Sequence, residues 1–473
     1  MFSVTPIGNN TKNGLFVTQN RLLSEDPEFL QRAGATFRWM LNDLKRGGQT
    51  GAEDLGIDMR LLEKIVTGKK PIPPDLLQKA VQIWPVNERD FAPIHDDLPQ
   101  GVNIMSCAES RNSSRVLSRG GHPYYEYRDT AMTRLAPLRP EFIKLLRVVD
   151  DTNPENPLVI WNHGHFLYQL TFFVGDCNYY YEWNGRKYCV AMTTGDSVFG
   201  LPFVKHTFTS RNPNALGHIL ALTFSGLLGG DSRQELAALG ARVAKKIATQ
   251  ARTQGALLAL HIANGAYSVD FLAAESGVSC QSIERAIHDL ESLSLTDLQA
   301  LAEAMRIPMR ELLVPVLDVS HGIMLVRGKS ARSWDFPMGS KPCYRFTELA
   351  GSCITPHMKA MVLEILGNEV PKNSIATNLY QYGYNYSSVA VTLVWLEGCK
   401  QHRAVLEPED SFIMKPHVPH WFARLESSIE APRVLLLRTG GRMVGDSAIE
   451  ASMIGPQLIQ RVIGEMGCWY DEE

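Results

Sequence analysis

The feature that most constrains the fold of this chain is a repeat whose two copies lie 214 residues apart. Gly195–His206 reads Gly-Asp-Ser-Val-Phe-Gly-Leu-Pro-Phe-Val-Lys-His, and Glu409–His420 reads Glu-Asp-Ser-Phe-Ile-Met-Lys-Pro-His-Val-Pro-His. A second pair of similar segments, Asp54–Asp58 and Glu275–Ser279, is separated by 221 residues. Motifs that recur at nearly the same offset indicate that one structural unit is present twice.

Within each unit, a helical pattern precedes a strand-like one. From Pro27, apolar residues recur at spacings of three and four, and Asp58 and Gly68 are signals for the start and end of a short helix. Residues 96–228 are instead rich in aromatic and β-branched residues, and Asn184-Gly185 is a hairpin signal. We therefore predict an α+β fold, a tandem repeat of a helix-turn-helix-like helical domain and a cupin (jelly-roll) β-barrel. The predicted units are 1–95, which begins with a polar arm over 1–25, then the barrel 96–228, the second helical domain 229–318 and the second barrel 319–473.

Two histidines and a glutamine in the first predicted barrel are candidate metal ligands. We expect Trp161–Gln169 to form a strand on which His165 and Gln169 face the same side, and His206 to begin a later strand. Two imidazoles and one oxygen donor on neighbouring strands match the facial triad of non-heme Fe(II) oxygenases. The oxygen donor of such a triad is normally a carboxylate. Here it is an amide, and Gly200, the other position that could supply an acid, has no side chain.

A simpler interpretation of the same residues stays open. His165 and Gln169 could be a hydrogen-bonded pair in a barrel that holds no metal. If Gln169 is not a ligand, the available carboxylates are Glu126, Glu182 and Asp196.

The second barrel is predicted to be metal-degenerate. Residues 373–396, which should carry the partner ligands, contain no His, Asp or Glu. We therefore expect His417 and His420 to be structural residues without partners nearby.

Three polar residues near the candidate ligands could bind an anionic substrate. The guanidinium of Arg119 offers a planar fork of donors suited to a phosphonate or a carboxylate, and Tyr127 and Asn162 could each donate one hydrogen bond. The alternative is that the tyrosines are core residues and that Arg119 forms an ion pair on the surface. Lys45, at the end of a predicted helix, would by itself be a solvated surface residue.

Charge and composition argue against several classes of protein. With a formal net charge of −3, the chain has no overall basic field that would attract nucleic acid or a membrane. Residues 258–315 carry three Lys or Arg against eight Asp or Glu, a poor balance for binding DNA. The eight cysteines are scattered without a C-x-x-C pair, as expected of free thiols in a reducing compartment. No apolar run approaches the length of a membrane span, and the N-terminus lacks the pattern of a secretory signal.

We therefore expect a cytoplasmic homo-oligomer that binds neither a membrane nor nucleic acid. A transcription regulator that senses a small anion through its cupin barrel stays open as an alternative from another class.

The arrangement Asn162-x-Gly-His165-x3-Gln169, then Pro202-x3-His206, on a barrel that follows a helix-turn-helix-like domain, resembles the phosphonate-active non-heme iron oxygenases. The resemblance extends over nearly the whole chain. It implies that Fe(II) is held by His165, Gln169 and His206. It also implies that the phosphonate is held by Arg119, Tyr127 and Asn162, and that Lys45 contacts the substrate or bound oxygen.

The implied reaction is the O2-dependent cleavage of the carbon–carbon bond of 2-hydroxyethylphosphonate, with all electrons drawn from that substrate. Glutamine at 169 and glycine at 200 resemble the branch of the family that releases methylphosphonate and carbon dioxide. The alternatives are the branch that releases hydroxymethylphosphonate and formate, and an isomerase or epoxidase acting on another phosphonate.

Overall fold

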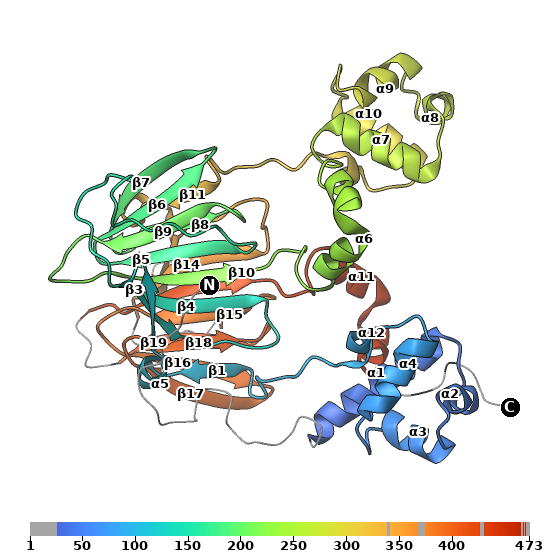
Figure 1. The fold of residues 1–473 in the computed structure, drawn as a ribbon, viewed down its shortest axis with the longest axis horizontal. Coiled ribbons are helices and arrows are strands. Elements are labelled where there is room, and N and C mark those ends of the chain that lie inside the picture. Colours follow the sequence, from blue (N-terminus) through green and yellow to red (C-terminus); the bar gives the residue numbers. More distant parts are fainter. Residues whose placement is uncertain are drawn as a thin grey trace.

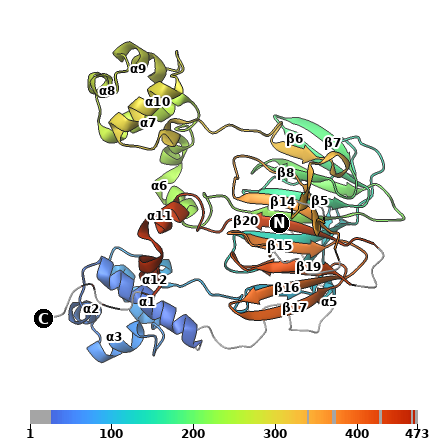
Figure 2. The same cartoon turned by 180° about the vertical axis from the view of Figure 1, so that it is seen from behind.

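The computed structural model describes residues 26–337, 341–367, 374–425 and 430–464, together with 467 and 469. The arm predicted over 1–25 lies outside the described residues. Two β-barrels lie side by side, and both helical domains lie on the same side of them, apart from each other (Figure 1). The view from behind places α6 (Asp231–Ile247), α11 (Asp446–Ile454) and α12 (Pro456–Gly464) between the two helical domains (Figure 2). The fold is therefore a mixture of helix and sheet in separate regions.

The first helical domain has the short helices that its sequence signals indicate. The side chain of Asp58 accepts a hydrogen bond from the backbone nitrogen of Arg60, and Gly68, with a φ of +69°, follows the end of the same helix. Phe37 and Ile65 are fully buried in the apolar core that these helices share. The elements are α1 (Pro27–Asp43), α2 (Gly48–Leu55), α3 (Met59–Val66), α4 (Pro74–Ile83) and the 3-10 helix η2 (Glu88–Phe91).

The second helical domain is also built from short helices. Leu258, Leu272 and Ile283 are fully buried in its core. Its elements are α7 (Gln254–Gly265), α8 (Val269–Ser276), α9 (Cys280–Ile287), α10 (Leu295–Met305) and η3 (Met309–Leu312). No single helix in the described part of the chain is both long and apolar enough to cross a membrane. Helices α7 and α8 reach that length only as a pair, which bends by 101° at the break.

The first barrel packs a seven-stranded sheet, in the order β11-β8-β5-β10-β4-β3-β2, against a three-stranded sheet, β7-β6-β9. Phe173 of β5 and Phe208 of β9 meet in the core between the sheets, with ring centroids 5.9 Å apart. The strands of this half of the chain are β2 (Arg115–Arg119), β3 (His122–Asp129), β4 (Leu138–Leu145), β5 (Tyr168–Val174), β6 (Cys177–Trp183), β7 (Arg186–Met192), β8 (Ser197–Gly200), β9 (Lys205–Ser210) and β10 (His218–Phe224).

The second barrel has the same strand order as the first. Its sheets run β1-β18-β15-β20-β14-β13-β12 and β17-β16-β19, so that β18, β15 and β20 occupy the places of β8, β5 and β10. Its strands are β12 (Ser333–Phe336), β13 (Tyr344–Glu348), β14 (Met358–Ile365), β15 (Tyr380–Asn385), β16 (Val391–Glu397), β17 (Lys400–Leu406), β18 (Ser411–Met414), β19 (His420–Arg424) and β20 (Arg433–Thr439).

Each barrel receives one strand from the other half of the chain. Strand β1 (Val102–Met105) pairs with β18 of the second barrel, and β11 (Ile323–Val326) pairs with β8 of the first. The boundaries predicted at 96 and 319 assign both strands to the opposite barrel, because a strand's pairing partner leaves no local trace in the sequence. Helices α11 and α12, after the last strand, were not expected either.

A shared apolar core joins the two barrels. Leu170 and Phe199 of the first barrel and Tyr382 and Leu437 of the second are all fully buried in it. Residues on the opposite faces of the same strands line the interior of each barrel separately. The alternation of side chains along a strand therefore decides which positions of β5 face a barrel interior: Leu170 faces the second barrel, whereas its neighbour Gln169 faces inward.

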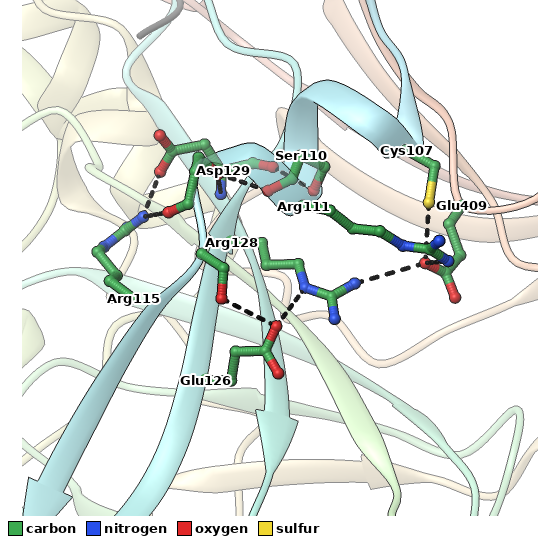
Figure 3. A network of polar contacts seen from close by, with 10 residues as sticks. Cys107, Ser110, Arg111, Arg115, Glu126, Arg128, Asp129 and Glu409 are labelled. Carbon is green, nitrogen blue, oxygen red and sulfur yellow. Dashed lines mark hydrogen bonds and ion pairs between the residues drawn. The ribbon is translucent and has the colours of Figure 1, made fainter. Parts of the chain in front are cut away.

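Charged groups link the barrels at the edge of this core (Figure 3). The carboxylate of Glu409 lies 3.3 Å from Nη2 of Arg111 and 3.6 Å from Nη1 of Arg128, and it accepts a hydrogen bond from Sγ of Cys107. Nε of Arg128 is also 2.6 Å from the carboxylate of Glu126. Burial acts to raise the pKa of Glu409, but the hydrogen bond from Cys107 and the charge and hydrogen bond of Arg111 hold it below its ordinary value. Glu409 is therefore an ionised group from the second barrel bound by cations from the first.

Candidate metal centre

His165 lies in a loop, and the strand predicted over Trp161–Gln169 is wrong at this position. Residues 159–165 have no regular structure, and β5 begins three residues after His165. Gly164 has a φ of +74°, and a Cβ there would lie 2.6 Å from the backbone oxygen of Phe203. The backbone nitrogen of Phe203 in turn donates to the oxygen of His165 at 2.7 Å. A left-handed residue cannot continue a pleated strand, and here it brings the loop against the segment that precedes β9.

His206 lies near the start of β9, as predicted, and faces His165. The two ring centroids are 5.1 Å apart and the rings are nearly perpendicular. Nδ1 of His206 is 2.9 Å from the backbone oxygen of Val204, and Nδ1 of His165 is 3.0 Å from that of Leu167. A carbonyl oxygen can only accept, so Nδ1 of each neutral imidazole carries the hydrogen and Nε2 presents a lone pair. This tautomer leaves Nε2 of each ring able to bind a metal.

Gln169 completes the set and points its oxygen at His165. Its Nε2 donates to Oγ1 of Thr171 at 2.7 Å, which leaves Oε1 3.0 Å from Nε2 of His165. With the hydrogen of His165 on Nδ1, both of these atoms are acceptors, and two lone pairs so close repel unless a cation shares them. The donor set therefore fits a divalent metal ion held by two imidazole nitrogens and one amide oxygen.

The carboxylates considered as alternative ligands are all engaged elsewhere. Asp196 pairs with Arg327 at 2.7 Å, whereas Glu126 and Glu182 pair with residues on their own sheets. Among the described residues, no group of three or more His, Cys, Asp or Glu side chains could hold a metal. Gly200 lies opposite Gln169 in the register, and a Cβ there would meet only the backbone oxygen of Gln169, at 3.9 Å. The space beside the amide is therefore open.

Burial keeps His206 in the form that binds metals. It lowers the pKa of His206 to about 4, against the smaller opposing effect of the hydrogen bond to Val204, and the nearby His165 and Arg119 act in the same direction as burial. His206 is therefore neutral over the physiological range of pH, with its Nε2 lone pair available.

Arg119, on β2, reaches over to the strand that carries His206. Its Nη1 donates to the backbone oxygen of Ile160 at 3.0 Å and to Oγ1 of Thr207 at 3.2 Å, and its guanidinium lies 4.8 Å from the ring centroid of Tyr125. None of the ion pairs in the described part of the chain involves Arg119. Its charge is therefore available to an anion, which disfavours the alternative of a surface ion pair.

Tyr127 and Asn162 each retain a hydrogen-bond donor. Burial raises the pKa of Tyr127 to about 12, although Arg119 acts to lower it, so the phenol keeps its proton. Oδ1 of Asn162 accepts from the backbone nitrogens of Gly164 at 3.0 Å and His206 at 2.8 Å. Because the oxygen is engaged twice, the amide nitrogen is the end of Asn162 that remains for a ligand.

Lys45 lies apart from the other six candidates. Its Nζ donates to the backbone oxygen of Asp43 at 3.3 Å and lies 4.7 Å from the ring centroid of Trp469. Lys45 follows α1, which lies on the helical side of the molecule, away from β5 and β9 (Figure 1). Within the described chain, the structure therefore does not bring Lys45 to the candidate metal centre.

Two threonines contribute to the site without having been predicted. Thr171 orients the amide of Gln169, and Thr207 anchors Arg119. Thr171 could have been found, because it lies two residues after Gln169 on a strand and so shares its face. Thr207 has no comparable signal, since its role depends on a contact with β2.

The second barrel contains a partner for His420, contrary to the prediction that it has none. Nε2 of Gln381 lies 2.9 Å from Nε2 of His420, and Oε1 of Gln381 accepts from Nε of Arg438 at 2.8 Å. The prediction considered only charged residues and histidine as partners and so overlooked the amide.

Known proteins resemble this chain over almost its entire length, although no family model matches it. The methylphosphonate synthase of Nitrosopumilus maritimus (strain SCM1) is 36% identical over 449 residues, which cover 94% of this chain and 96% of that protein. The structure of Streptomyces albus HEPD, solved with its substrate 2-hydroxyethylphosphonate and Fe(II) bound, is 40% identical. It aligns with a TM-score of 0.90 over 94% of this chain and 99% of its own. A variant of 2-hydroxyethylphosphonate dioxygenase that is 20% identical aligns with a TM-score of 0.72 over 90% of this chain and 99% of its own, and shares the fold.

Proposed function

We propose that this chain, which belongs to the family of methylphosphonate synthase and 2-hydroxyethylphosphonate dioxygenase, acts as a methylphosphonate synthase. The observation that carries the proposal is the opposition of two acceptors, Nε2 of His165 and Oε1 of Gln169, beside the neutral imidazole of His206. A site with two histidines and a neutral amide leaves the double charge of Fe(II) uncompensated. Such a site favours a substrate that brings its own negative charge.

The reaction converts one 2-hydroxyethylphosphonate and one O2 into one methylphosphonate, one carbon dioxide and one water. The bond between the two carbons breaks, the hydroxyl-bearing carbon is oxidised, and O2 is the only oxidant. Bound Fe(II) supplies the activation of O2. The Fe(II) would be held by His165, Gln169 and His206.

The protein's own polar groups bind and orient the phosphonate. Arg119 supplies a cation whose Nη1 is already fixed, Tyr127 supplies a phenol that remains protonated, and Asn162 supplies its amide nitrogen. The surrounding aromatic side chains exclude water, and charge–charge attraction is stronger in such an interior than at the surface. These groups would bind the phosphonate and so orient the substrate toward the three candidate metal ligands.

Lys45 is proposed to act on the substrate or on oxygen only after it leaves its contacts with Asp43 and Trp469. Because Lys45 lies on the helical side of its own chain, we propose that it reaches the site of a neighbouring copy in a homo-oligomer. Comparing the turnover of Lys45→Ala with that of the unaltered protein tests whether Lys45 takes part in the reaction. Equal turnover would contradict this role.

A second outcome, release of hydroxymethylphosphonate and formate, is favoured by one observation. The Streptomyces albus HEPD structure is 40% identical to this chain, a value above the 36% for the methylphosphonate synthase. Phosphorus NMR of the products from 2-hydroxyethylphosphonate, Fe(II) and O2 separates the two. Methylphosphonate as the main product supports the proposal, hydroxymethylphosphonate supports the second outcome, and unreacted substrate contradicts both.

We also propose that the chain is a tandem repeat and that its second barrel has lost its metal site. The support is the common order of strands in the two seven-stranded sheets and the absence of a second histidine beside Gln381 among the described residues. The metal content of the purified protein tests this, with about one iron per chain expected.

A further inference from the structure

We propose that Arg438 takes the place of a metal ion in the second barrel and keeps metal ions out of it. This inference goes beyond the proposed reaction. It rests on the proposed function only in treating the first barrel as a metal site.

Arg438 lies where the first barrel has a small residue beside its metal-binding amide. In the first barrel, Gln169 of β5 pairs with Thr223 of β10. In the second, Gln381 of β15 pairs with Arg438 of β20, and the two strands hold the corresponding places in the sheet. Residues directly opposite each other in an antiparallel pair project to the same face. Arg438 therefore projects into the barrel beside the amide.

Three further positions correspond between the two sites. His420 has the surroundings of His206, with its Nδ1 2.9 Å from the backbone oxygen two residues earlier. Thr377 precedes Gln381 by four residues, as His165 precedes Gln169. The backbone oxygen of Thr377 accepts from the nitrogen of His417 at 2.7 Å. The oxygen of His165 accepts the equivalent bond from the nitrogen of Phe203, so the second barrel keeps this backbone contact and has Thr377 in place of the imidazole.

The direction of the hydrogen bonds differs between the barrels, and this difference carries the inference. In the first barrel, the amide oxygen of Gln169 faces an imidazole lone pair, an arrangement that needs a cation. In the second, the amide is reversed: Nε2 of Gln381 donates to Nε2 of His420, and Nε of Arg438 donates to Oε1 of Gln381. Each acceptor then has a donor. The guanidinium supplies the positive charge, and no metal is needed.

The space around the amide has been filled as well. Gly200, opposite Gln169, is replaced by Met414, opposite Gln381, which is buried. Thr171, which holds the Gln169 amide, is replaced by Gly383, where a Cβ would lie 2.1 Å from the ring of Phe412. Without that hydroxyl the amide is free to turn its nitrogen toward the imidazole.

The charge of Arg438 has no acidic counterpart in the described part of the chain. Its side chain is largely buried, and burial alone accounts for the lowering of its pKa. Its Nη2 is buried and bonded to no described group, so the hydrogen bond from Nε to Gln381 anchors the guanidinium. A fixed positive charge at this distance from the amide oxygen repels a divalent cation that would use the same oxygen.

The test counts metal ions in full-length protein in which the first site has been removed by His165→Ala. Four proteins on this background are loaded with Co(II): no further change, Thr377→His, Arg438→Thr, and Thr377→His with Arg438→Thr. Metal per folded chain is measured by elemental analysis, and the visible spectrum of Co(II) reports nitrogen ligation. We expect about one equivalent in the last protein and at least about tenfold less in the other three, because only that protein has three ligands and no guanidinium.

Two results would overturn the inference. Binding in the protein that has Thr377→His but keeps Arg438 would mean that the guanidinium does not exclude metal. A folded protein with both changes that binds no Co(II) would mean that Arg438 does not stand in a metal's place. Neither result depends on turnover, so a failure of the proposed reaction is distinguishable from a failure here.

A stability measurement covers the case in which the combined variant does not fold. Arg438→Thr alone should lower Tm clearly, because Gln381 loses its donor, whereas Arg433→Thr on the same strand, an exposed residue paired with Glu364, should change Tm little. Equal Tm values for the two variants would contradict the role assigned to Arg438.

Discussion

The amide nitrogen of Gln169 donates to the hydroxyl of Thr171 at 2.7 Å, and this bond turns the amide oxygen toward His165. Thr171→Val keeps the shape of the side chain but removes the acceptor, so the amide can turn over. We expect a loss of roughly 10- to 100-fold in affinity for Fe(II), the usual size of such an effect, measured by metal titration of the apoprotein. Thr171→Ser keeps a hydroxyl and should stay near the original affinity. Equal affinities of the Val and Ser variants for Fe(II) would show that the hydrogen bond from Gln169 to residue 171 does not contribute to metal binding.

His165→Ala and His206→Ala should each abolish tight iron binding, whereas Gln169→Glu should retain iron. A carboxylate is an equal or better ligand than an amide, and Gly200 leaves room beside it. Iron content after desalting measures both effects. The change from a neutral to a charged ligand should alter the ratio of products, which phosphorus NMR measures. An iron-free Gln169→Glu protein that is folded would contradict direct ligation by residue 169.

Arg119→Lys should weaken substrate recognition. Lysine keeps the charge but cannot donate to Ile160, Thr207 and a phosphonate from one planar group. We expect kcat/KM for 2-hydroxyethylphosphonate to fall roughly 10- to 100-fold, which corresponds to about 1.4–2.7 kcal/mol. Arg115→Lys on the same strand is the control, since Arg115 is paired with Asp129 and Glu141. The prediction fails if kcat/KM falls by the same factor in both variants.

Glu409→Gln should loosen the contact between the barrels. Arg128, whose side chain is only 13% exposed, would keep Glu126 but lose its second anionic partner. A fall of about 1–3 kcal/mol in the free energy of unfolding is expected from urea denaturation. Glu348→Gln, which removes an exposed pair with Arg332, should cost about 1 kcal/mol or less. A larger effect at 348 than at 409 would contradict this account.

The protein should lose stability in mild acid partly through His218. Burial lowers the pKa of His218 from 6.5 to about 4; Arg128 and Lys144 add to this shift, whereas Glu409 opposes it. Between pH 6.5 and about 4, His218 is therefore protonated in the unfolded chain but not in the folded chain. The free energy of unfolding falls as the pH falls through that window. The slope approaches about 1.4 kcal/mol per pH unit for one group. His218→Gln should flatten the dependence of unfolding on pH, and His122→Gln, at an exposed site, should not.

The helices and the general nature of the barrels could be predicted because their signals are local. Asp58 begins a helix through a bond to Arg60, two residues away, and Gly68 ends it through its own backbone conformation. The exchange of β1 and β11 could not be predicted. Val102 pairs with Met414, and the residues around Val102 give no sign of which distant strand it pairs with. The C-terminal helices were missed because the strand pattern was extended to the end of the chain.

The candidate ligands could be predicted from spacing, but their local geometry could not. The four-residue interval from His165 to Gln169 suggested a strand, and Gly164 was the overlooked sign of a turn. The direction of the amide could not be read either, because it depends on whether a neighbour offers an acceptor, as Thr171 does, or a donor, as Arg438 does.

The strand exchange between the barrels has a consequence for the integrity of the molecule. A fragment that ends before β11 would leave β8, the strand beside Gln169, as an uncovered sheet edge, and a fragment that begins after β1 would do the same to β18. An uncovered sheet edge can pair with strands of other chains, so the isolated halves would aggregate or associate with each other. Each half of the chain is thus needed to complete a sheet of the other, and β11 covers the strand that lies beside Gln169.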